Sequence, residues 1–106
     1  MKKTLEHTSL LVLSLLKTGD MYGYQMIVEL ERRSDRTFQM KEGTLYPILK
    51  KLENAGALTC YEADAGGRKR KYYHITPGGL AQLQAETEEW RGYSHGIDAV
   101  LGFVTG

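Results

Sequence analysis

Two groups of positively charged residues carry the clearest chemistry in this sequence. Lys50 and Lys51 follow closely after Thr44 and Tyr46, and four consecutive cations occur at Arg68–Lys71. Lysine and arginine neutralise the phosphates of a nucleic acid, while hydroxyl-bearing side chains bond to phosphate, sugar and base edges. Residues of these types, in this order, predict a surface that binds DNA.

Each group also has a plainer interpretation. Lys50-Lys51 alone is typical of a solvated helix face, and Arg68–Lys71 alone is typical of an edge strand kept soluble by its charge. DNA binding is favoured because the two groups occur together and in this order. Alternate side chains of a strand point to opposite faces, so we expect two of the four cations at 68–71 to reach one line of phosphates.

Other kinds of site find no support in the sequence. His7, His74 and His95 are scattered and lack a second ligand at metal-binding spacing, so we predict no metal. Gly66-Gly67 is not followed by the Gly-Lys-Ser/Thr ending of a phosphate-binding loop. The single cysteine, Cys60, cannot form an intrachain disulfide, which is typical of a reducing compartment, and we expect it to pack in a strand. We therefore predict neither an enzyme nor a cofactor.

The cations must be positioned by short helices and a hairpin. Apolar spacing predicts a buried helix over 5–17 and a second helix over 22–33, capped by Asp20. Gly23 inside the second helix indicates that another backbone passes close by. A third helix is expected from 42–44 to about 53, with Thr44 as its N-cap and Pro47 at its third position. Its core stripe is Leu45, Leu49 and Leu52.

The rest of the chain is predicted to form a hairpin and one long helix. Strands are expected over 57–63 and 69–75, joined by a turn at 64–67. Thr76-Pro77 then begins the last helix, with threonine as the cap and proline at the first helical position. Apolar residues recur along this helix at spacings of three and four, which is the pattern of a seam between two paired helices. We expect dimerisation through Leu80, Leu83, Thr87, Trp90, Ile97, Leu101 and Val104.

Length and charge distribution agree with this interpretation. A chain of 106 residues with 42% hydrophobic content predicts one folded domain rather than a disordered segment. The net charge is +1, but residues 41–80 sum to +3 and residues 81–106 to −3. The basic charge is thus concentrated on the predicted DNA-binding region. The apolar run at 10–16 is too short to cross a bilayer, so no membrane association is expected.

Several motifs along the chain together carry a family resemblance. They are Tyr22–Tyr24, then Glu42–Pro47 with Leu49–Glu53, then Gly67–Tyr73 with Ile75-Thr76. With these motifs and Trp90 on a final helix, the chain resembles the PadR family of bacterial winged-helix transcriptional regulators, in its short-tailed branch. The resemblance covers essentially the whole chain. It implies a cytoplasmic homodimer that represses transcription on a palindromic operator and is released by a ligand.

The resemblance also suggests an effector site. In some short-tailed relatives, a pair of tryptophans sandwiches flat aromatic compounds in a pore at the dimer centre. This implies a planar aromatic effector and a site made of Ser9, Ser14, Trp90, Ser94 and Ile97. Trp90 has a second interpretation that stays open here, as an aromatic residue packed in the core of the dimer.

The sequence thus predicts a mainly α fold with one β-hairpin. A winged helix-turn-helix at 1–76 is followed by a dimerisation helix at 77–106. The predicted partners are double-stranded operator DNA, a second copy of the chain and the aromatic effector. The alternative is a winged-helix module that binds protein and has no sequence-specific DNA binding. The predicted DNA-binding residues are Thr44, Tyr46, Pro47, Lys50, Lys51, Arg68, Lys69, Arg70 and Lys71.

Overall fold

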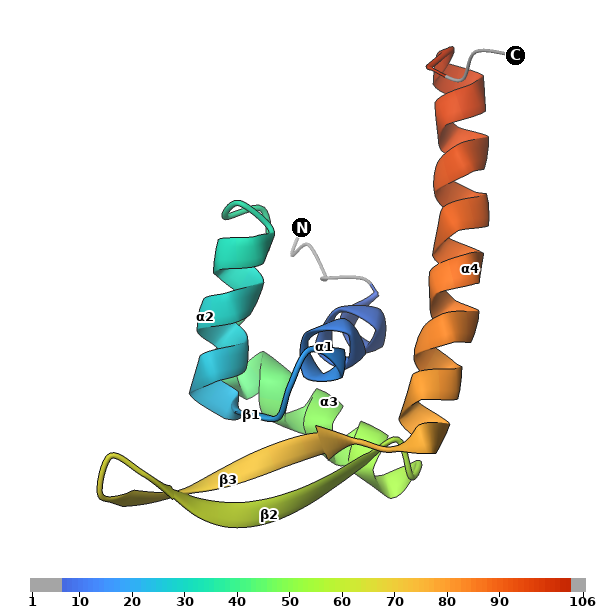
Figure 1. Ribbon diagram of the computed structural model, residues 1–106. Helices are drawn as coiled ribbons and strands as arrows, with labels where there is room; N and C mark the ends of the chain where they lie inside the picture. The colour runs from blue at the N-terminus through green and yellow to red at the C-terminus, as the bar shows by residue number, and fades with distance from the viewer. Residues whose placement is uncertain (1–6, 104–106) are drawn as a thin grey trace.

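The computed structural model of the chain describes residues 7–103 and has four helices and three strands within that range. Figure 1 shows α1 between α2 and α4, with the sheet below them and α4 rising away from the rest of the chain. The predicted winged helix-turn-helix with an added C-terminal helix is confirmed. The elements are α1 (Thr8–Lys17), β1 (Met21–Tyr22), α2 (Gly23–Arg33), α3 (Glu42–Asn54), β2 (Leu58–Ala65), β3 (Arg68–Ile75) and α4 (Pro77–Leu101).

The hydrophobic core lies where α1, α2, α3 and the sheet meet. Leu13 and Leu49 have no exposed surface, so α1 and the buried stripe of α3 form its centre. Tyr73 and Ile75 of β3 close the core from the side of the sheet, as the predicted alternation requires. Leu83 on α4 is also buried, so the first turns of α4 belong to the same core. The predicted boundary between 76 and 77 therefore runs through a continuous packed region.

The sheet has one strand more than the sequence predicted. β1 pairs antiparallel with β3 through Met21 and Tyr22, which gives the strand order β1-β3-β2. Two residues are too few to show a period, so the sequence carries no signal for this strand. β2 and β3 turn at Gly66-Gly67, where both residues have positive φ angles of 60° and 80°. This hairpin, β2 with β3, is called the wing below.

The capping prediction for α2 was wrong. The N-cap of α2 is Tyr22, whose backbone amide donates to the side-chain Oε1 of Gln25 at 3.0 Å. The Asp20 carboxylate lies one residue before β1 and faces the sheet, where Oδ2 accepts a hydrogen bond from the Tyr61 hydroxyl at 2.6 Å. An aspartate before a helix is a common cap, but here a short strand intervenes and redirects the side chain.

The start of α3 was also predicted wrongly. Lys41 is the N-cap, and Thr44 lies in the first turn, where its amide donates to the Lys41 carbonyl at 3.0 Å. Pro47 consequently lies well inside the helix rather than at its third position. Proline there removes one intrahelical hydrogen bond. α3 nevertheless continues to Asn54, because its apolar stripe is buried against the core.

The last helix begins as predicted. The Thr76 hydroxyl accepts from the Gly79 amide at 3.0 Å, and Pro77 occupies the first turn of α4. The same hydroxyl donates to the Gly56 carbonyl at 2.6 Å, just after α3. The beginning of α4 is therefore fastened to the segment that leaves α3.

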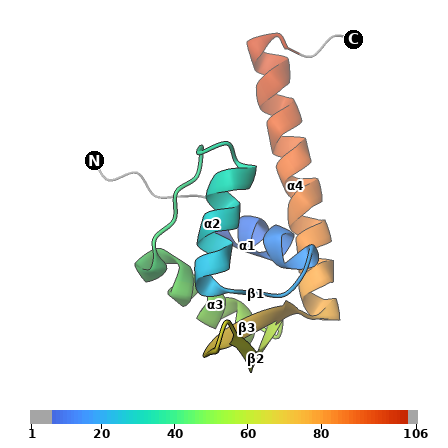
Figure 2. The ribbon, with the colours of Figure 1, turned by 60° about the vertical axis from the view of Figure 1, so that its left-hand side comes forward.

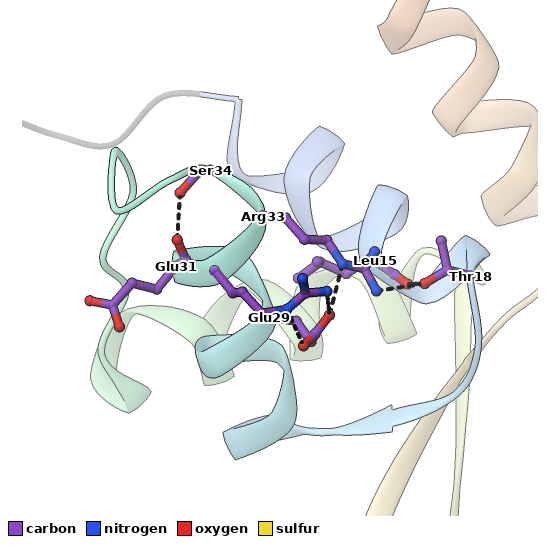
Figure 3. A network of polar contacts seen from close by, with 7 residues as sticks. Leu15, Thr18, Glu29, Glu31, Arg33 and Ser34 are labelled. Atoms are coloured by element: carbon purple, nitrogen blue, oxygen red, sulfur yellow. Dashed lines mark hydrogen bonds and ion pairs between the residues drawn. The ribbon is translucent and has the colours of Figure 1, made fainter.

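A polar network holds the C-terminal ends of α1 and α2 together (Figure 3). The Glu29 carboxylate accepts hydrogen bonds from Arg32 and Arg33, which lower its pKa to about 2. Arg33 Nη2 also donates to the Thr18 hydroxyl at 3.1 Å, and that hydroxyl donates to the Leu15 carbonyl at 2.7 Å. These two arginines are thus engaged within the fold.

Candidate nucleic-acid interface

The outer face of α3 displays all five side chains that the sequence assigned to DNA on this helix. Leu45, Leu49 and Leu52 are buried, and this stripe fixes the orientation of the helix. The remaining face is open to solvent and carries Thr44, Tyr46, Pro47, Lys50 and Lys51. The helix thus presents two free ammonium groups beside a hydroxyl and a phenol.

Tyr46 is exposed over 45% of its surface, but its hydroxyl end lies against the start of α2. A Cβ atom added to Gly23 would lie 2.6 Å from the Tyr46 hydroxyl oxygen and 3.0 Å from Cζ. The sequence had suggested that another backbone passes close to Gly23. The close neighbour is instead the Tyr46 side chain. Glycine at position 23 gives Tyr46 the space for its position between α2 and α3.

The register of the wing divides its four cations between two faces. Arg68 and Arg70 alternate onto the face of Tyr72, whereas Lys69 and Lys71 lie on the side of Tyr73. Three of these cations, Arg68, Lys69 and Lys71, are exposed, and Arg70 is half-buried. Within residues 7–103, none of the four forms an ion pair with a carboxylate. Their charges are therefore not neutralised inside the fold.

The outer face of the sheet holds a polar and aromatic cluster that the sequence did not predict. Asp20 Oδ1 lies 2.8 Å from His74 Nδ1, and its other oxygen accepts from Tyr61. The Tyr61 hydrogen bond, and after it His74, hold the pKa of Asp20 below its ordinary value. Tyr61 and Tyr72 stack at 5.7 Å between ring centroids. The pairing of β1 with β3 creates this cluster, so a sequence analysis without β1 gave no sign of it.

Cys60 behaves as a structural residue. Its thiol donates to Glu53 Oε2 at 3.0 Å, and this hydrogen bond raises the pKa of the Cys60 thiol. A raised pKa keeps the thiol protonated and unreactive. The partly buried position agrees with the expected packing in a wing strand.

The residues assigned to an effector occupy different places along α1 and α4. Ser14 lines an open groove of about 520 Å³ between these helices, together with Thr87 and Arg91. Ser9 lies elsewhere and donates to Glu86 Oε1 at 2.6 Å. Trp90 makes an edge contact with His7 at 5.0 Å between centroids.

Two further residues of the predicted effector site, Ser94 and Ile97, lie beyond Trp90 on α4 and do not line the groove. A single chain therefore does not bring the five predicted side chains together. The effector site stays a prediction.

The predicted dimerisation seam is mostly exposed. Leu80, Trp90, Ile97 and Leu101 have 39–60% of their surface accessible. Leu83, by contrast, is buried in the core of its own chain, because heptad spacing marks apolar positions without showing which chain covers them. The Thr87 hydroxyl donates to the Leu83 carbonyl. Val104 lies outside the described residues.

The apolar surface of α4 extends beyond that seam. Tyr93, Val100 and Phe103 are exposed over 60%, 89% and 75% of their surface. The predicted seam did not include these residues, since they fall outside its three-and-four spacing. Tyr93 and Val100 belong to the C-terminal half of α4, which rises above the other helices in Figures 1 and 2, and Phe103 follows the end of the helix.

Among the residues that the structure describes, no three His, Cys, Asp or Glu side chains form a group that could hold a metal ion. None of the described helices combines the length and apolar character that crossing a bilayer requires.

Comparison with known proteins identifies the family. The model of the transcriptional regulator PadR-like family matches residues 12–85. Transcriptional regulator Rv3488 of Mycobacterium tuberculosis is 34% identical over 84 residues, which are 79% of this chain and 73% of the relative. A transcriptional regulator from Clostridium thermocellum has a similar structure, with a TM-score of 0.81 and 32% identity over 88% of this chain and 91% of that one.

A third similar structure includes DNA. It is Bacillus subtilis PadR in complex with operator DNA, with a TM-score of 0.68 and 26% identity. The match covers 76% of this chain but 46% of that longer one. The family match, the relatives and the fold agree, and this chain belongs to the PadR-like family of transcriptional regulators.

Proposed function

We propose that this regulator binds double-stranded DNA as a homodimer on a palindromic operator and represses transcription there, in the bacterial cytoplasm. The observation that carries the proposal is the set of exposed cations on α3 and the wing, which form no ion pair with a carboxylate within residues 7–103. Lys50, Lys51 and the exposed wing cations extend from one recognition helix into an adjacent hairpin. A helix in the major groove with a hairpin over the flanking phosphates matches such a surface.

Within this surface the residues have different tasks. Thr44, Tyr46 and Lys50 are on the face of α3 that would enter the groove, and they read or position base pairs. Pro47 lies among them and packs against the DNA without donating a backbone hydrogen bond. Lys51 and the exposed wing cations hold phosphates.

The distal part of α4 would form the dimer. Tyr93, Ile97 and Leu101 expose large apolar surfaces on a helix that leaves the body of the protein, and Phe103 is exposed just after the helix ends. Apolar surface of this extent on a small protein marks an interface. Two-fold pairing through α4 would present two copies of α3 to successive major grooves, about 34 Å apart on B-form DNA. A palindromic operator follows from that symmetry.

A planar aromatic effector is part of the same proposal. Trp90 is 39% exposed and packs edge-on against His7, so part of its indole ring is free to stack on a flat ligand once two chains meet. The effector would act by favouring dimers whose α3 helices do not match the operator. Since Trp90 is the single tryptophan, its fluorescence reports directly on this site. We expect planar dyes to quench it, and no quenching across a varied panel would remove the effector from the proposal.

A salt titration tests the DNA-binding proposal. Binding of the full-length protein to a labelled mixed-sequence duplex is measured by fluorescence anisotropy between 50 and 300 mM potassium chloride, about a sixfold range over which counterion release is measurable. We expect the logarithm of the association constant to fall steeply and linearly with the logarithm of the salt concentration. Absence of binding at low salt would instead favour a winged-helix module that binds protein. Sedimentation velocity on the same protein tests the homodimer.

A further inference from the structure

Arg70 differs from the other three wing cations in its surroundings. Its side chain is half-buried, whereas Arg68, Lys69 and Lys71 are exposed. Its Nε atom is buried without a hydrogen-bond partner among the described residues. Its guanidinium carbon lies 4.7 Å from the centroid of the Tyr22 ring. Arg70 therefore rests on an aromatic ring of β1 instead of extending into solvent.

The register of the sheet explains this contact. Tyr22 pairs with Tyr72 across β1 and β3, and Arg70 precedes Tyr72 by two residues on the same face of β3. Arg70 is thus the diagonal cross-strand neighbour of Tyr22, within reach of a long side chain. The Tyr22 and Tyr72 rings form a T-shaped pair, with 5.5 Å between centroids and 82° between planes. Tyr22 is thus packed against Tyr72 while Arg70 lies over its ring.

Tyr22 connects this contact to the helix-turn-helix. It is the N-cap of α2, and its backbone amide is bonded to Gln25. Gly23, the next residue, lies against Tyr46 of α3. A side chain that holds the wing to Tyr22 therefore holds it to the same junction on which Tyr46 rests.

We propose that Arg70 is a positioning residue: through Tyr22 it fixes the wing relative to α3, so that Arg68 and Lys69 meet the phosphates, and it does not itself neutralise a phosphate. The inference deepens the proposed function and rests on it for its DNA readout. A guanidinium stacked on a ring with its Nε covered has lost part of the fork that binds phosphate.

Arg68 provides the matched control. It carries the same charge on the same face of the same strand, but it is exposed, and the cation over the Tyr22 ring is Arg70. Arg68→Ala should flatten the logarithmic salt slope of binding to a mixed-sequence duplex by about 0.9 per lost contact. Arg70→Ala should weaken binding about tenfold, the equivalent of one partly desolvated cation–π contact, and change the slope by less than half as much as Arg68→Ala does.

A double-mutant cycle identifies the partner. Tyr22→Leu should weaken binding as much as Arg70→Ala, and the double variant should be no weaker than either. Tyr22→Phe keeps the ring and should bind like the wild type. Arg70→Lys, which retains the charge but lacks the planar group, should recover only part of the affinity. A slope for Arg70→Ala as flat as that of Arg68→Ala, or additive effects in the cycle, would overturn the inference.

Hydrogen exchange provides a readout without DNA. Amides of β3 should exchange faster in Arg70→Ala and Tyr22→Leu than in the wild type. Their exchange rates in Arg68→Ala should equal those of the wild type. Equal exchange in all four proteins would overturn the positioning role, whether or not DNA binds. If the wild type binds no duplex while β3 exchange follows the expected pattern, the proposed function fails but the link between the wing and Tyr22 holds.

Discussion

Arg68→Ala gives the sharpest quantitative test of the proposed DNA-binding surface. Five cations per chain are exposed on it: Lys50, Lys51, Arg68, Lys69 and Lys71. If each meets one phosphate in both chains of a dimer, ten contacts give a slope of log K against log salt of about −9. In a dimer, Arg68→Ala removes two of these contacts and should flatten the slope by about 1.8. In a monomer it removes one contact, and the slope should flatten by about 0.9. The size of the change thus reports the number of chains on the duplex.

The assay needs a control for long-range charge. Arg91→Ala removes the same charge from α4, which rises away from the wing in Figure 1, and should leave the slope unchanged. Both variants are compared with the wild type by anisotropy over the same salt series. Arg68→Ala alters a side chain that has no ion pair among the residues that the structure describes, so melting temperatures should agree. An unchanged slope for Arg68→Ala, or equal changes for both variants, would refute the assignment of the wing to phosphate.

Three further substitutions test other parts of the structure. Ile97→Glu should raise the dimer dissociation constant by about 10²–10⁴, since two buried isoleucines contribute about 3–6 kcal/mol, and sedimentation of a variant that stays dimeric would contradict the α4 interface. Gly23→Ala should displace the Tyr46 ring and weaken DNA binding in the wild type but not in a Tyr46→Ala background; a titration showing equal loss in both would disprove the contact. Asp20 has a lowered pKa through Tyr61, so its contribution to stability is present above its ordinary pKa and disappears as pH falls through the folded value. The difference in unfolding free energy between wild type and Asp20→Asn, from urea titrations, should therefore shrink below pH 4, about the ordinary pKa of aspartate, and a constant difference would argue against it.

Long periodic patterns and local capping chemistry could be predicted from the sequence. The stripe of Leu45, Leu49 and Leu52 fixed which face of α3 is outside, because burial of three leucines outweighs the hydrogen bond lost at Pro47. Thr76-Pro77 marked the start of α4, since a threonine cap before proline satisfies the first amides without tertiary help.

Contacts between distant segments could not be predicted in the same way. β1 has two residues and no period, so Asp20 appeared to be a helix cap although it bonds to Tyr61, forty-one residues away. The crowding at Gly23 was visible as an unusual glycine, but the sequence did not show that the neighbour is Tyr46. Likewise, the heptad pattern placed Leu83 and Leu101 on one seam, whereas the fold buries the first within its own chain and exposes the second. In each case the sequence marks the residue as one with a special role, but the residue that it contacts depends on how the elements are arranged in the fold.

The way α4 begins suggests how a signal at the dimer interface would reach the DNA. The Thr76 hydroxyl is bonded to the carbonyl of Gly56, directly after α3, and Glu86 on α4 accepts from Ser9 on α1. The first turns of α4 are therefore fixed to the body that carries α3, while within residues 7–103 no side-chain hydrogen bond joins its distal turns to that body. A ligand that changes the angle between two paired α4 helices would turn both bodies, and with them the spacing of the two α3 helices. To shift dimers from 99% to 1% DNA-competent, it would have to bind the second arrangement about 10⁴-fold more tightly. If the ligand distinguished the two arrangements only through its contacts with Trp90, the free energy of those contacts would have to differ by about 5.5 kcal/mol between them. A ligand held between the two Trp90 rings on the two-fold axis would contact both chains, so its binding would depend directly on the angle between the two α4 helices.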